Sequence, residues 1–442
     1  MDSNSGEGSA SGFMTQHQSI SAVDQMNVDI RTVHQQMLKH KVSPVAIVDS
    51  CLDRIERLNP TLNAFITVLP NQAREDSRLA HSEIAAGRVR GPLQGIPIGV
   101  KDFYDTADIR TTAAFEGFKN RVPKSDAVGV AKLKKAGAIV IGKTNMHRLG
   151  MGTTGVESAF GPVRNPWNVD YIAGGSSSGS AAAVASGMCF ATLDTDAIGS
   201  CRLPASCCGV VGFKGTYGLI SPRGILEGEE DPGEMIRWFS HPGIMARSVE
   251  DVAIVLDILA ERPQSERPSY LEAIRKDLNL RVGVANNFEA HQKVRQAFHV
   301  AVEQIRALGC TTTNVAAPLR HPVSDLRKIE SDRRLIASEA FHDIDVMLLP
   351  TTVAAVPTVE EARNNGQALS AANTVFANYY GLPAISIPSG FDQNGLPFGL
   401  QIVGKPWDEA GVLHLAYQYE MATAWADISP ELLGLSKRLQ EK

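Results

Sequence analysis

The sequence predicts an α/β fold, a single large domain in which a central mixed, mostly parallel twisted sheet is covered by helices on both faces. Two observations support this prediction. Short apolar runs bounded by glycine alternate with segments of helical periodicity. No linker or internal repeat divides the chain after residue 26, and 442 residues are enough for one large core. We therefore expect one domain over residues 27–442, preceded by a disordered Ser/Gly-rich tail over residues 1–26.

The N-terminal half begins with helical spacing, with apolar residues at i, i+3 and i+4, and then changes to short apolar runs. The predicted elements are, in order, two helices within residues 27–58 broken near Ser43-Pro44, a helix over 70–87, a strand over 95–100, a helix over 126–136 and a strand over 137–141. Pro97 lies inside the first strand run, so we expect that strand to start there or to be irregular at its edge.

The middle of the chain, residues 174–224, is rich in Gly, Ser and Ala and poor in charge, which is typical of a site and not of a surface. The alternation of helices and strands resumes after it. The predicted elements are a helix over 249–261, strands over 280–285, 345–352, 382–390 and 397–404, and a final helix.

Composition excludes several classes of function. Charged residues make up 21% of the chain and the net charge is −5, so no basic surface for nucleic acid is expected. No run of 18 apolar residues and no signal peptide occurs, which predicts a cytoplasmic protein without a membrane partner. Six irregularly spaced cysteines and histidines without ligand spacing predict no disulfide framework, no catalytic metal and no other cofactor. We expect a small-molecule substrate and a monomer or homodimer.

Two motifs match well-known patterns without their structural context. Residues 137–144, GAIVIGKT, satisfy the phosphate-loop pattern, but their interior is a predicted strand and not an open glycine-rich loop. Residues 175–179, GSSSG, fit the nucleophile elbow of α/β hydrolases with Ser177 as the nucleophile. A turn-rich segment precedes them, where the elbow requires a buried strand. We therefore favour neither the nucleotide-binding nor the elbow interpretation.

The stretch TDAIGSCRLP places two nucleophiles, Ser200 and Cys201, side by side without a nearby histidine. A neutral lysine can activate a serine hydroxyl, and burial in apolar surroundings lowers the pKa of lysine enough for this. Lys101 ends the predicted strand GIPIGVK and is a candidate for this role, although an ion pair with Asp102 or another acid is an equal alternative. Successive backbone N–H groups in TDAIGS are suited to stabilising an oxyanion, and a tight structural turn is the alternative for this segment.

Several blocks together resemble the amidase signature family of serine amidohydrolases. They are GPLQGIPIGVKD, GAIVIGKTNM, SAFGPVRNPWN, GGSSSGSAAAVASG, TDAIGSCRLPASCCGVVGFKGTYG, GLPAISIPSG and GLPFGLQIVG, in the order of the family. The resemblance covers most of the chain, residues 27–425. The spacing agrees as well, with 75 residues from Lys101 to Ser176 and 24 from Ser176 to Ser200. Within the family, the chain resembles aryl acylamidases and urethanases.

The resemblance implies a Ser/cis-Ser/Lys triad. Ser200 would be the nucleophile, and Ser176, preceded by a cis peptide bond, would relay its proton to neutral Lys101. The implied oxyanion-hole donors are the backbone N–H groups of Ala197, Ile198, Gly199 and Ser200. Asp196 and Arg202 would brace this loop, and Ser177 would support the relay. The candidate substrate contacts are Thr153, Thr154, Gly174, Gly175, Met235 and Trp238.

The chain also departs from the family pattern. Ser178 and Ile198 stand where relatives usually have glycine, and we expect Ile198 to narrow or wall the acyl pocket. Cys201 should point away from the site as a small core residue. Residues 307–352 are shorter than in most members, which suggests a more open substrate channel. Residues 225–239 are interpreted as a substrate-contacting loop or lid, or equally as an ordinary surface loop.

The sequence leaves two enzymatic hypotheses open. The first is a stand-alone hydrolase for the C–N bonds of amides, above all aryl acylamides, or of carbamates, with an acyl- or carbamoyl-serine intermediate and possible esterase activity. The second is the glutaminase subunit of a tRNA-dependent amidotransferase. Such subunits tend to carry Gly-Gly-Ser-Ile-Arg-Gln-Pro where this chain has IGSCRLP.

Overall fold

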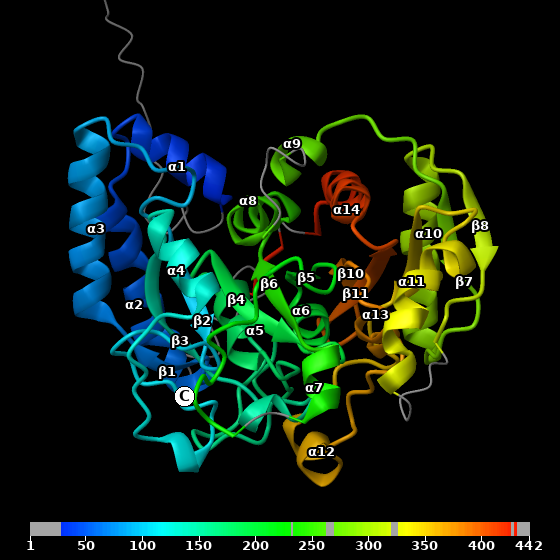
Figure 1. The fold of residues 1–442 in the computed structure, drawn as a ribbon, viewed down its shortest axis with the longest axis horizontal. Helices are drawn as coiled ribbons and strands as arrows, with labels where there is room; N and C mark the ends of the chain where they lie inside the picture. Colours follow the sequence, from blue (N-terminus) through cyan, green and yellow to red (C-terminus); the bar gives the residue numbers. More distant parts are fainter. Residues whose placement is uncertain (1–27, 231–232, 262–268, 320–325, 426–427, 431–442) are drawn as a thin grey trace, which may run out of the picture.

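An 11-stranded sheet runs through the computed structural model, which describes residues 28–230, 233–261, 269–319, 326–425 and 428–430 (Figure 1). The strand order is β1-β3-β2-β4-β6-β5-β10-β11-β9-β7-β8. The strands are β1 (Phe65–Val68), β2 (Pro97–Lys101), β3 (Ile139–Thr144), β4 (Ala191–Asp196), β5 (Val211–Lys214), β6 (His241–Ala246), β7 (Val282–Ala285), β8 (Thr312–Val315), β9 (Val346–Pro350), β10 (Ala384–Phe391) and β11 (Pro397–Gly404). The predicted tail, residues 1–26, lies outside the described residues.

The helices surround the sheet. They are α1 (Ile30–Leu38), α2 (Pro44–Leu62), α3 (Pro70–Ala85), α4 (Val128–Lys135), α5 (Ser178–Ala185), α6 (Arg202–Cys208), α7 (Glu234–Phe239), α8 (Val249–Leu259), α9 (Tyr270–Ala273), α10 (Gln292–Ala307), α11 (Ile329–Ala340), α12 (Val359–Asn364), α13 (Val375–Tyr379) and α14 (Glu409–Thr423). None of those in the described part of the chain is long and apolar enough to cross a membrane.

The break predicted near Ser43-Pro44 is confirmed and has a local cause. The Ser43 hydroxyl caps α2 by accepting from the backbone N–H of Ala46, and Pro44 occupies the first turn, where no N–H partner is needed. Pro97 begins β2, which confirms the predicted strand start.

The expectation of a mostly parallel sheet is wrong, although the sheet is mixed as predicted. Four of the ten strand pairings in the described chain are parallel, those of β2 with β3 and β4 and those of β7 with β8 and β9. The central strands pair antiparallel because β10 and β11 form a hairpin around Asn394-Gly395, and β6 inserts between β4 and β5. The alternation of strands and helices along the sequence does not predict which distant strands pair or in which direction.

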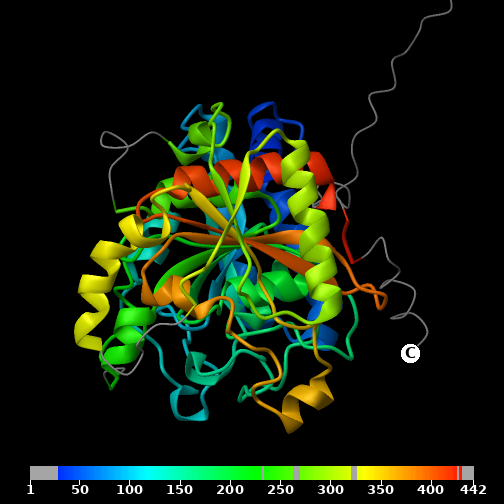
Figure 2. The same cartoon turned by 90° about the vertical axis from the view of Figure 1, so that its right-hand side faces the viewer.

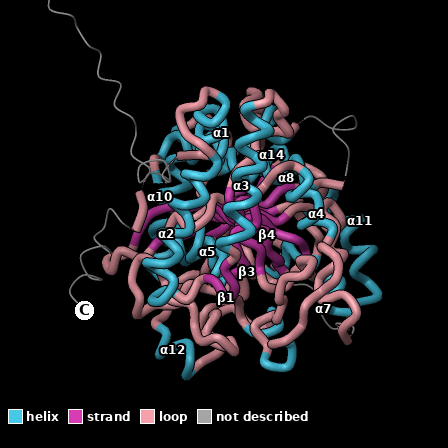
Figure 3. The backbone as a smooth tube through the Cα atoms, turned by 90° about the vertical axis from the view of Figure 1, so that its left-hand side faces the viewer, coloured by secondary structure: helices cyan, strands magenta, loops and turns pink. Residues whose placement is uncertain are grey.

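Two layers of helices enclose the sheet. Helices α8 and α14 pack on one face, and α5 and α6 pack against strands from the opposite side (Figure 2). Figure 3 shows the strands gathered at the centre of the molecule with helices and loops around them. Every residue of α5 is buried, and a Cβ added to Gly179 would lie 2.2 Å from the Ala64 carbonyl oxygen. The small side chains of α5 therefore let its N-terminal segment lie directly against the strand ends.

The phosphate-loop match is a buried strand. Residues 139–144 form β3, and the side chain of Lys143 is fully buried. Its Nζ donates to the carbonyl oxygen of Tyr104 at 2.7 Å and to the hydroxyl of Thr111 at 2.6 Å. A lysine held in this way cannot reach a bound phosphate, so the segment does not function as a phosphate loop.

Candidate active site

The site lies at the carboxyl ends of two neighbouring strands. Lys101 is the last residue of β2, and Asp196 is the last residue of β4. The two strands are parallel, so their ends meet at the same edge of the sheet, where α/β proteins commonly bind ligands. The chain leaving β4 forms the loop Ala197–Cys201 and then enters α6.

Lys101 contacts two hydroxyl groups and is fully buried. Its Nζ lies 2.8 Å from Ser176 Oγ and 2.7 Å from Thr195 Oγ1. Burial lowers the pKa of Lys101 to about 8, with Asp194 opposing the shift. The predicted alternative, an ion pair with Asp102, is not formed, because the Asp102 carboxylate pairs with Lys143 at 3.5 Å.

The segment before α5 brings two serines to this lysine. The peptide bond between Gly175 and Ser176 is cis, as the resemblance implied. The backbone N–H of Ser177 donates to the carbonyl oxygen of Ser200 at 3.1 Å, which joins the segment to the nucleophile loop. Ser176 and Ser200 are both buried, with exposed fractions of 1% and 3%. Ser177 Oγ donates to the Thr195 carbonyl oxygen at 3.3 Å, and its role in supporting the relay stays a prediction.

The carboxylate of Asp196 shapes the loop of residues 197–200. The backbone N–H of Gly199 donates to Asp196 Oδ1 at 2.8 Å, and that of Cys201 donates to Oδ2 at 3.1 Å. The prediction that Gly199 is an oxyanion donor therefore differs from the structure, because its N–H is used inside the loop. Ala197, Ile198 and Ser200 remain as predicted donors.

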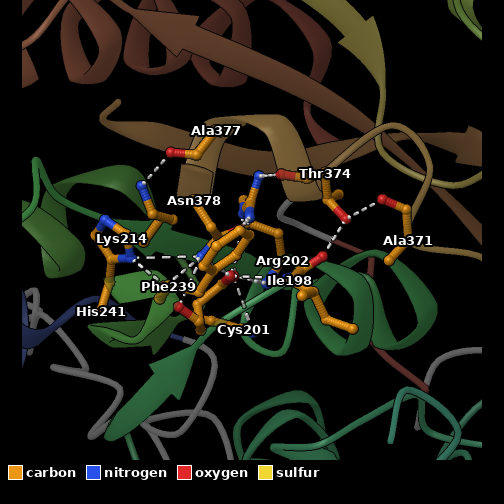
Figure 4. A network of polar contacts seen from close by, with 12 residues as sticks. Ile198, Cys201, Arg202, Lys214, Phe239, His241, Ala371, Thr374, Ala377 and Asn378 are labelled. Atoms are coloured by element: carbon orange, nitrogen blue, oxygen red, sulfur yellow. Dashed lines mark hydrogen bonds and ion pairs between the residues drawn. The ribbon is translucent and has the colours of Figure 1, made fainter. Parts of the chain in front are cut away.

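Arg202 completes this bracing and connects it to α13. Its Nε and Nη2 bind the two oxygens of Asp196 at 3.0 and 2.9 Å, and Nη1 donates to the Thr374 carbonyl oxygen at 3.0 Å. Burial would raise the pKa of Asp196, but the Arg202 charge and hydrogen bonds hold it well below its usual value. Asn378 binds both partners, donating to Asp196 Oδ1 at 2.9 Å and accepting from Arg202 Nη2 at 2.6 Å (Figure 4).

Cys201 is turned away from the reacting edge. It is fully buried, and its Sγ lies 3.6 and 3.4 Å from the carbonyl oxygens of Phe213 and Ile244 on neighbouring strands. Burial raises the pKa of the Cys201 thiol well above its ordinary value, so the thiolate is suppressed. The expectation that Cys201 is a small core residue is confirmed.

An apolar wall stands beside the nucleophile loop. It consists of buried Phe239, Ile329 and Tyr379 and half-buried Ala197, Ile198, Trp238, Leu326, Val375 and Tyr380. Ile198 and Trp238, the second of which was predicted to contact substrate, thus pack against the same buried cluster. Trp238 comes from α7, which ends the 225–239 segment. The side chain of Met235 lies outside the described part of the structure.

The shortened segment 307–352 contributes helix α11 to this wall. Arg333 of α11 donates to the carbonyl oxygens of Trp238, Asn378 and Tyr379 at 2.6, 3.0 and 2.7 Å. It therefore ties α7 to α13. Whether the channel is more open than in relatives stays a prediction.

The remaining candidate substrate contacts, Thr153, Thr154, Gly174 and Gly175, lie in chain segments close to the cis peptide bond. Thr153 is buried and its hydroxyl donates to the Leu369 carbonyl oxygen at 2.7 Å, whereas the buried Thr154 hydroxyl has no partner among the described residues. A Cβ on Gly175 would lie 2.7 Å from the Gly155 nitrogen, and one on Gly174 would lie 2.8 Å from the Pro204 Cα. The two glycines therefore pack on protein backbone, and their contact with substrate stays a prediction.

Three residues of the site were not anticipated: Thr195, Thr374 and Asn378. Thr195 contacts Lys101, and Thr374 Oγ1 donates to the Ile198 carbonyl oxygen at 2.5 Å. Thr195 lies inside the TDAIGS stretch, so its nearness to Ser200 was the available signal. Thr374 and Asn378 lie more than 170 residues further along the chain, and nothing in their local sequence marks them.

No group of three or more His, Cys, Asp or Glu side chains in the described ranges is arranged to hold a metal ion. All six cysteines are free. The chemistry available at this edge therefore consists of two serine hydroxyls, a lysine of lowered pKa and backbone N–H groups.

Comparisons with known proteins show which family the chain resembles in sequence and in structure. The chain matches the amidase family over residues 46–329 and 324–413. It is 32% identical over 486 aligned residues to a glutamyl-tRNA(Gln) amidotransferase subunit of Thermosynechococcus vestitus, covering 91% of this chain and 99% of that protein. The corresponding protein of a Nostoc species is 33% identical over 489 residues, with the same coverage.

Solved structures show the same architecture. The chain superimposes on 6-aminohexanoate cyclic dimer hydrolase in complex with its substrate with a TM-score of 0.79 and 27% identity, covering 92% of this chain and 100% of that chain. The native peptide amidase from Stenotrophomonas maltophilia gives a TM-score of 0.77 and 26% identity, covering 90% and 98%. Together with the match over most of the sequence, these likenesses show that the chain belongs to the amidase family of enzymes that act on amide C–N bonds.

Proposed function

We propose that this chain is a stand-alone hydrolase that cleaves the C–N bond of aryl acylamides and aryl carbamates. The intermediate is an acyl-Ser200 from an amide and an alkoxycarbonyl-Ser200 from a carbamate, since the amine leaves in both cases. The observation that carries the proposal is the contact of the buried Lys101 Nζ with Ser176 Oγ at 2.8 Å. A lysine with a pKa of about 8 is about one-tenth neutral at pH 7 and mostly neutral above pH 8, and only the neutral amine can accept a proton.

The mechanism follows from this arrangement. Lys101 takes the proton of Ser176 while Ser176 takes that of Ser200, and Ser200 Oγ adds to the substrate carbonyl carbon. The backbone N–H groups of Ala197, Ile198 and Ser200 stabilise the oxyanion. The C–N bond then breaks as the proton returns through Ser176 to the leaving amine. Water adds to the acyl-serine by the same route and releases the acid, or carbon dioxide and alcohol from a carbamate.

The apolar wall supports the choice of bulky substrates. Ile198 places a branched side chain on the nucleophile loop itself, and it packs against the same buried cluster as Trp238. A substrate ring buried against these groups would gain roughly 25 cal/mol for each Å² of apolar surface removed from water. A small primary amide gains little from such a surface, so aryl groups should be favoured.

The test is turnover of a chromogenic anilide and of an aryl carbamate by purified wild type, Ser200→Ala and Lys101→Ala. Both variants should lose about three orders of magnitude or more in kcat. Cys201→Ala is the matched control, since it removes a neighbouring buried nucleophile that points away from the site, and it should keep activity. Activity retained by Ser200→Ala, or lost only in Cys201→Ala, would overturn the assignment.

A second candidate function is the glutaminase subunit of a tRNA-dependent amidotransferase. It is favoured by the 32% and 33% identity to glutamyl-tRNA(Gln) amidotransferase subunits, which extends over 99% of their length. Activity on anilides and on glutamine distinguishes the two proposals. A stand-alone hydrolase turns over anilides without partner proteins and shows little activity on glutamine, whereas hydrolysis of glutamine alone, stimulated by added partner proteins, would support the second candidate.

A further inference from the structure

Besides Asp196, a second buried carboxyl group, that of Asp194, acts electrostatically on the candidate base Lys101 and has no role in the predicted triad. Asp194 is on β4, two residues before Asp196, and its side chain is fully buried. Strand β4 pairs in parallel with β2, with Val100 opposite Leu193. The next position along this register sets Asp194 beside Lys101, and paired residues of parallel strands point to the same face of the sheet.

The Asp194 carboxylate is only partly satisfied. Oδ2 accepts from the Thr192 hydroxyl at 2.5 Å, and Oδ1 has no hydrogen-bond partner among the described residues. The carbonyl oxygen of Asp194 accepts from the Tyr104 hydroxyl at 2.6 Å, which fixes the backbone. A buried carboxylate with an open oxygen is costly unless a positive charge lies nearby.

Two carboxylates therefore approach Lys101, and they differ in how their charge is balanced. Asp196 forms a bidentate ion pair with Arg202, at 2.9 and 3.0 Å. Asp194 forms no ion pair in the described part of the chain, so the field of its charge is not cancelled locally. Lys101 is the cation that faces it from the adjacent strand.

The electrostatics of the two groups agree with this placement. Burial lowers the pKa of Lys101 to about 8, and Asp194 is the main group that opposes this shift. Burial raises the pKa of Asp194 to about 6. Lys101 is the main group that opposes this shift, and the nearby hydroxyl groups of Ser180, Thr192 and Ser177 oppose it as well. Asp194 is therefore ionised where Lys101 titrates. The other titratable groups around the two are Asp196, Cys201, Cys189, Tyr104 and His147.

We propose that Asp194 is a positioning residue for the reaction, the carboxylate whose charge sets the pH at which Lys101 becomes able to accept the proton of Ser176. The inference rests on the proposed function in that it takes Lys101 as the base. It adds that the negative charge of Asp194 on β4 stabilises the protonated form of Lys101 on β2 in the resting enzyme.

The sign of the effect follows directly. An anionic Asp194 favours protonated Lys101, so removing the charge should lower the pKa of Lys101 further. More Lys101 is then neutral at pH 6–7. The acid limb of the pH profile should therefore move to lower pH in Asp194→Asn, by about one unit.

The experiment measures how fast a fluorophosphonate probe labels Ser200 between pH 6 and 10, and does so for wild type, Asp194→Asn and Asp102→Asn. Asp102→Asn is the matched control, because it neutralises another buried carboxyl that pairs with Lys143 and not with Lys101. We expect a midpoint about one unit lower in Asp194→Asn and an unchanged midpoint in Asp102→Asn. An unmoved or raised midpoint in Asp194→Asn, or an equal shift in both variants, would overturn the inference.

A second measurement uses the reciprocity of the coupling and does not require activity. In Lys101→Met, Asp194 loses its counter-charge, so the infrared spectrum at neutral pH should contain one more protonated buried carboxyl than in wild type. No difference would overturn the inference even if Asp194→Asn fails to fold. Failure of the probe to label Ser200 in wild type would instead refute the proposed function, and the infrared comparison would still decide the coupling.

Discussion

Asn378→Ala should both destabilise the protein and slow the chemical step, because Asn378 connects the nucleophile loop to α13. Its Nδ2 donates to the carbonyl oxygen and to Oδ1 of Asp196 at 2.7 and 2.9 Å, and its Oδ1 accepts from Arg202 Nη2 at 2.6 Å. Two of these bonds involve charged partners, each worth about 1.5–3 kcal/mol. We therefore expect a loss of about 3 kcal/mol or more in the free energy of unfolding.

The kinetic effect follows from the same contacts. Asp196 holds the backbone N–H groups of Gly199 and Cys201, so freeing its carboxylate should loosen the oxyanion loop. Removal of a direct oxyanion donor costs about 100- to 1000-fold in kcat, and an indirect loosening should cost less, about 10- to 100-fold. KM should change little, since Asn378 does not belong to the apolar wall.

The assay combines urea unfolding with kcat and KM on a chromogenic anilide. Asn373→Ala is the matched control, a nearby buried asparagine whose side chain bonds only the backbone of Glu289 in the described chain. Two neutral bonds are worth about 1–3 kcal/mol together, so Asn373→Ala should lose stability without losing kcat. An unchanged kcat in Asn378→Ala, or equal losses of kcat in both variants, would refute the reasoning.

Three further predictions concern the base, the wall and the phosphate-loop match. For wild type, kcat/KM should rise about tenfold per pH unit up to a midpoint near pH 8, because Lys101, with a pKa of about 8, must lose its proton to act as the base. A kcat/KM that does not change with pH would contradict this role of Lys101. Trp238→Ala should raise KM about tenfold or more for an aryl substrate and leave KM for a small primary amide unchanged, because only the aryl group is buried against the apolar wall. Equal effects on the KM of both substrates would argue against a role of the apolar wall in substrate binding. ATP should not raise the melting temperature, because Lys143 is buried. A ligand that binds the folded protein at about 100 times its Kd would add about 2.7 kcal/mol to the free energy of unfolding. A rise of the melting temperature of that size with ATP would restore the nucleotide-binding hypothesis.

Local chemistry accounts for what could be predicted of the fold. The break at Ser43-Pro44, the start of β2 at Pro97 and the strand character of residues 139–144 follow from caps, proline geometry and apolar runs, which act over a few residues. The direction of strand pairing was predicted wrongly. It depends on which distant strands meet, and the hairpin of β10 and β11 makes the centre of the sheet antiparallel.

The sequence by itself determined which residues are the candidates for the reaction. The resemblance of its blocks to the amidase signature family predicted roles for Lys101, Ser176 and Ser200. The structure brings Lys101 Nζ to 2.8 Å from Ser176 Oγ and joins the backbone of Ser177 to that of Ser200. Cys201 was also correctly assigned to the core.

Only the tertiary structure decided how these groups are controlled. It engages the N–H of Gly199 with Asp196, and it brings Asn378 from 182 positions away onto that carboxylate. It also pairs Val100 with Leu193 on two parallel strands, so that Lys101 and Asp194 are the next residue of each strand. The physical reason is that hydrogen bonds and charge interactions depend on distance in space, and local residue patterns carry no information on which remote segments will lie within reach.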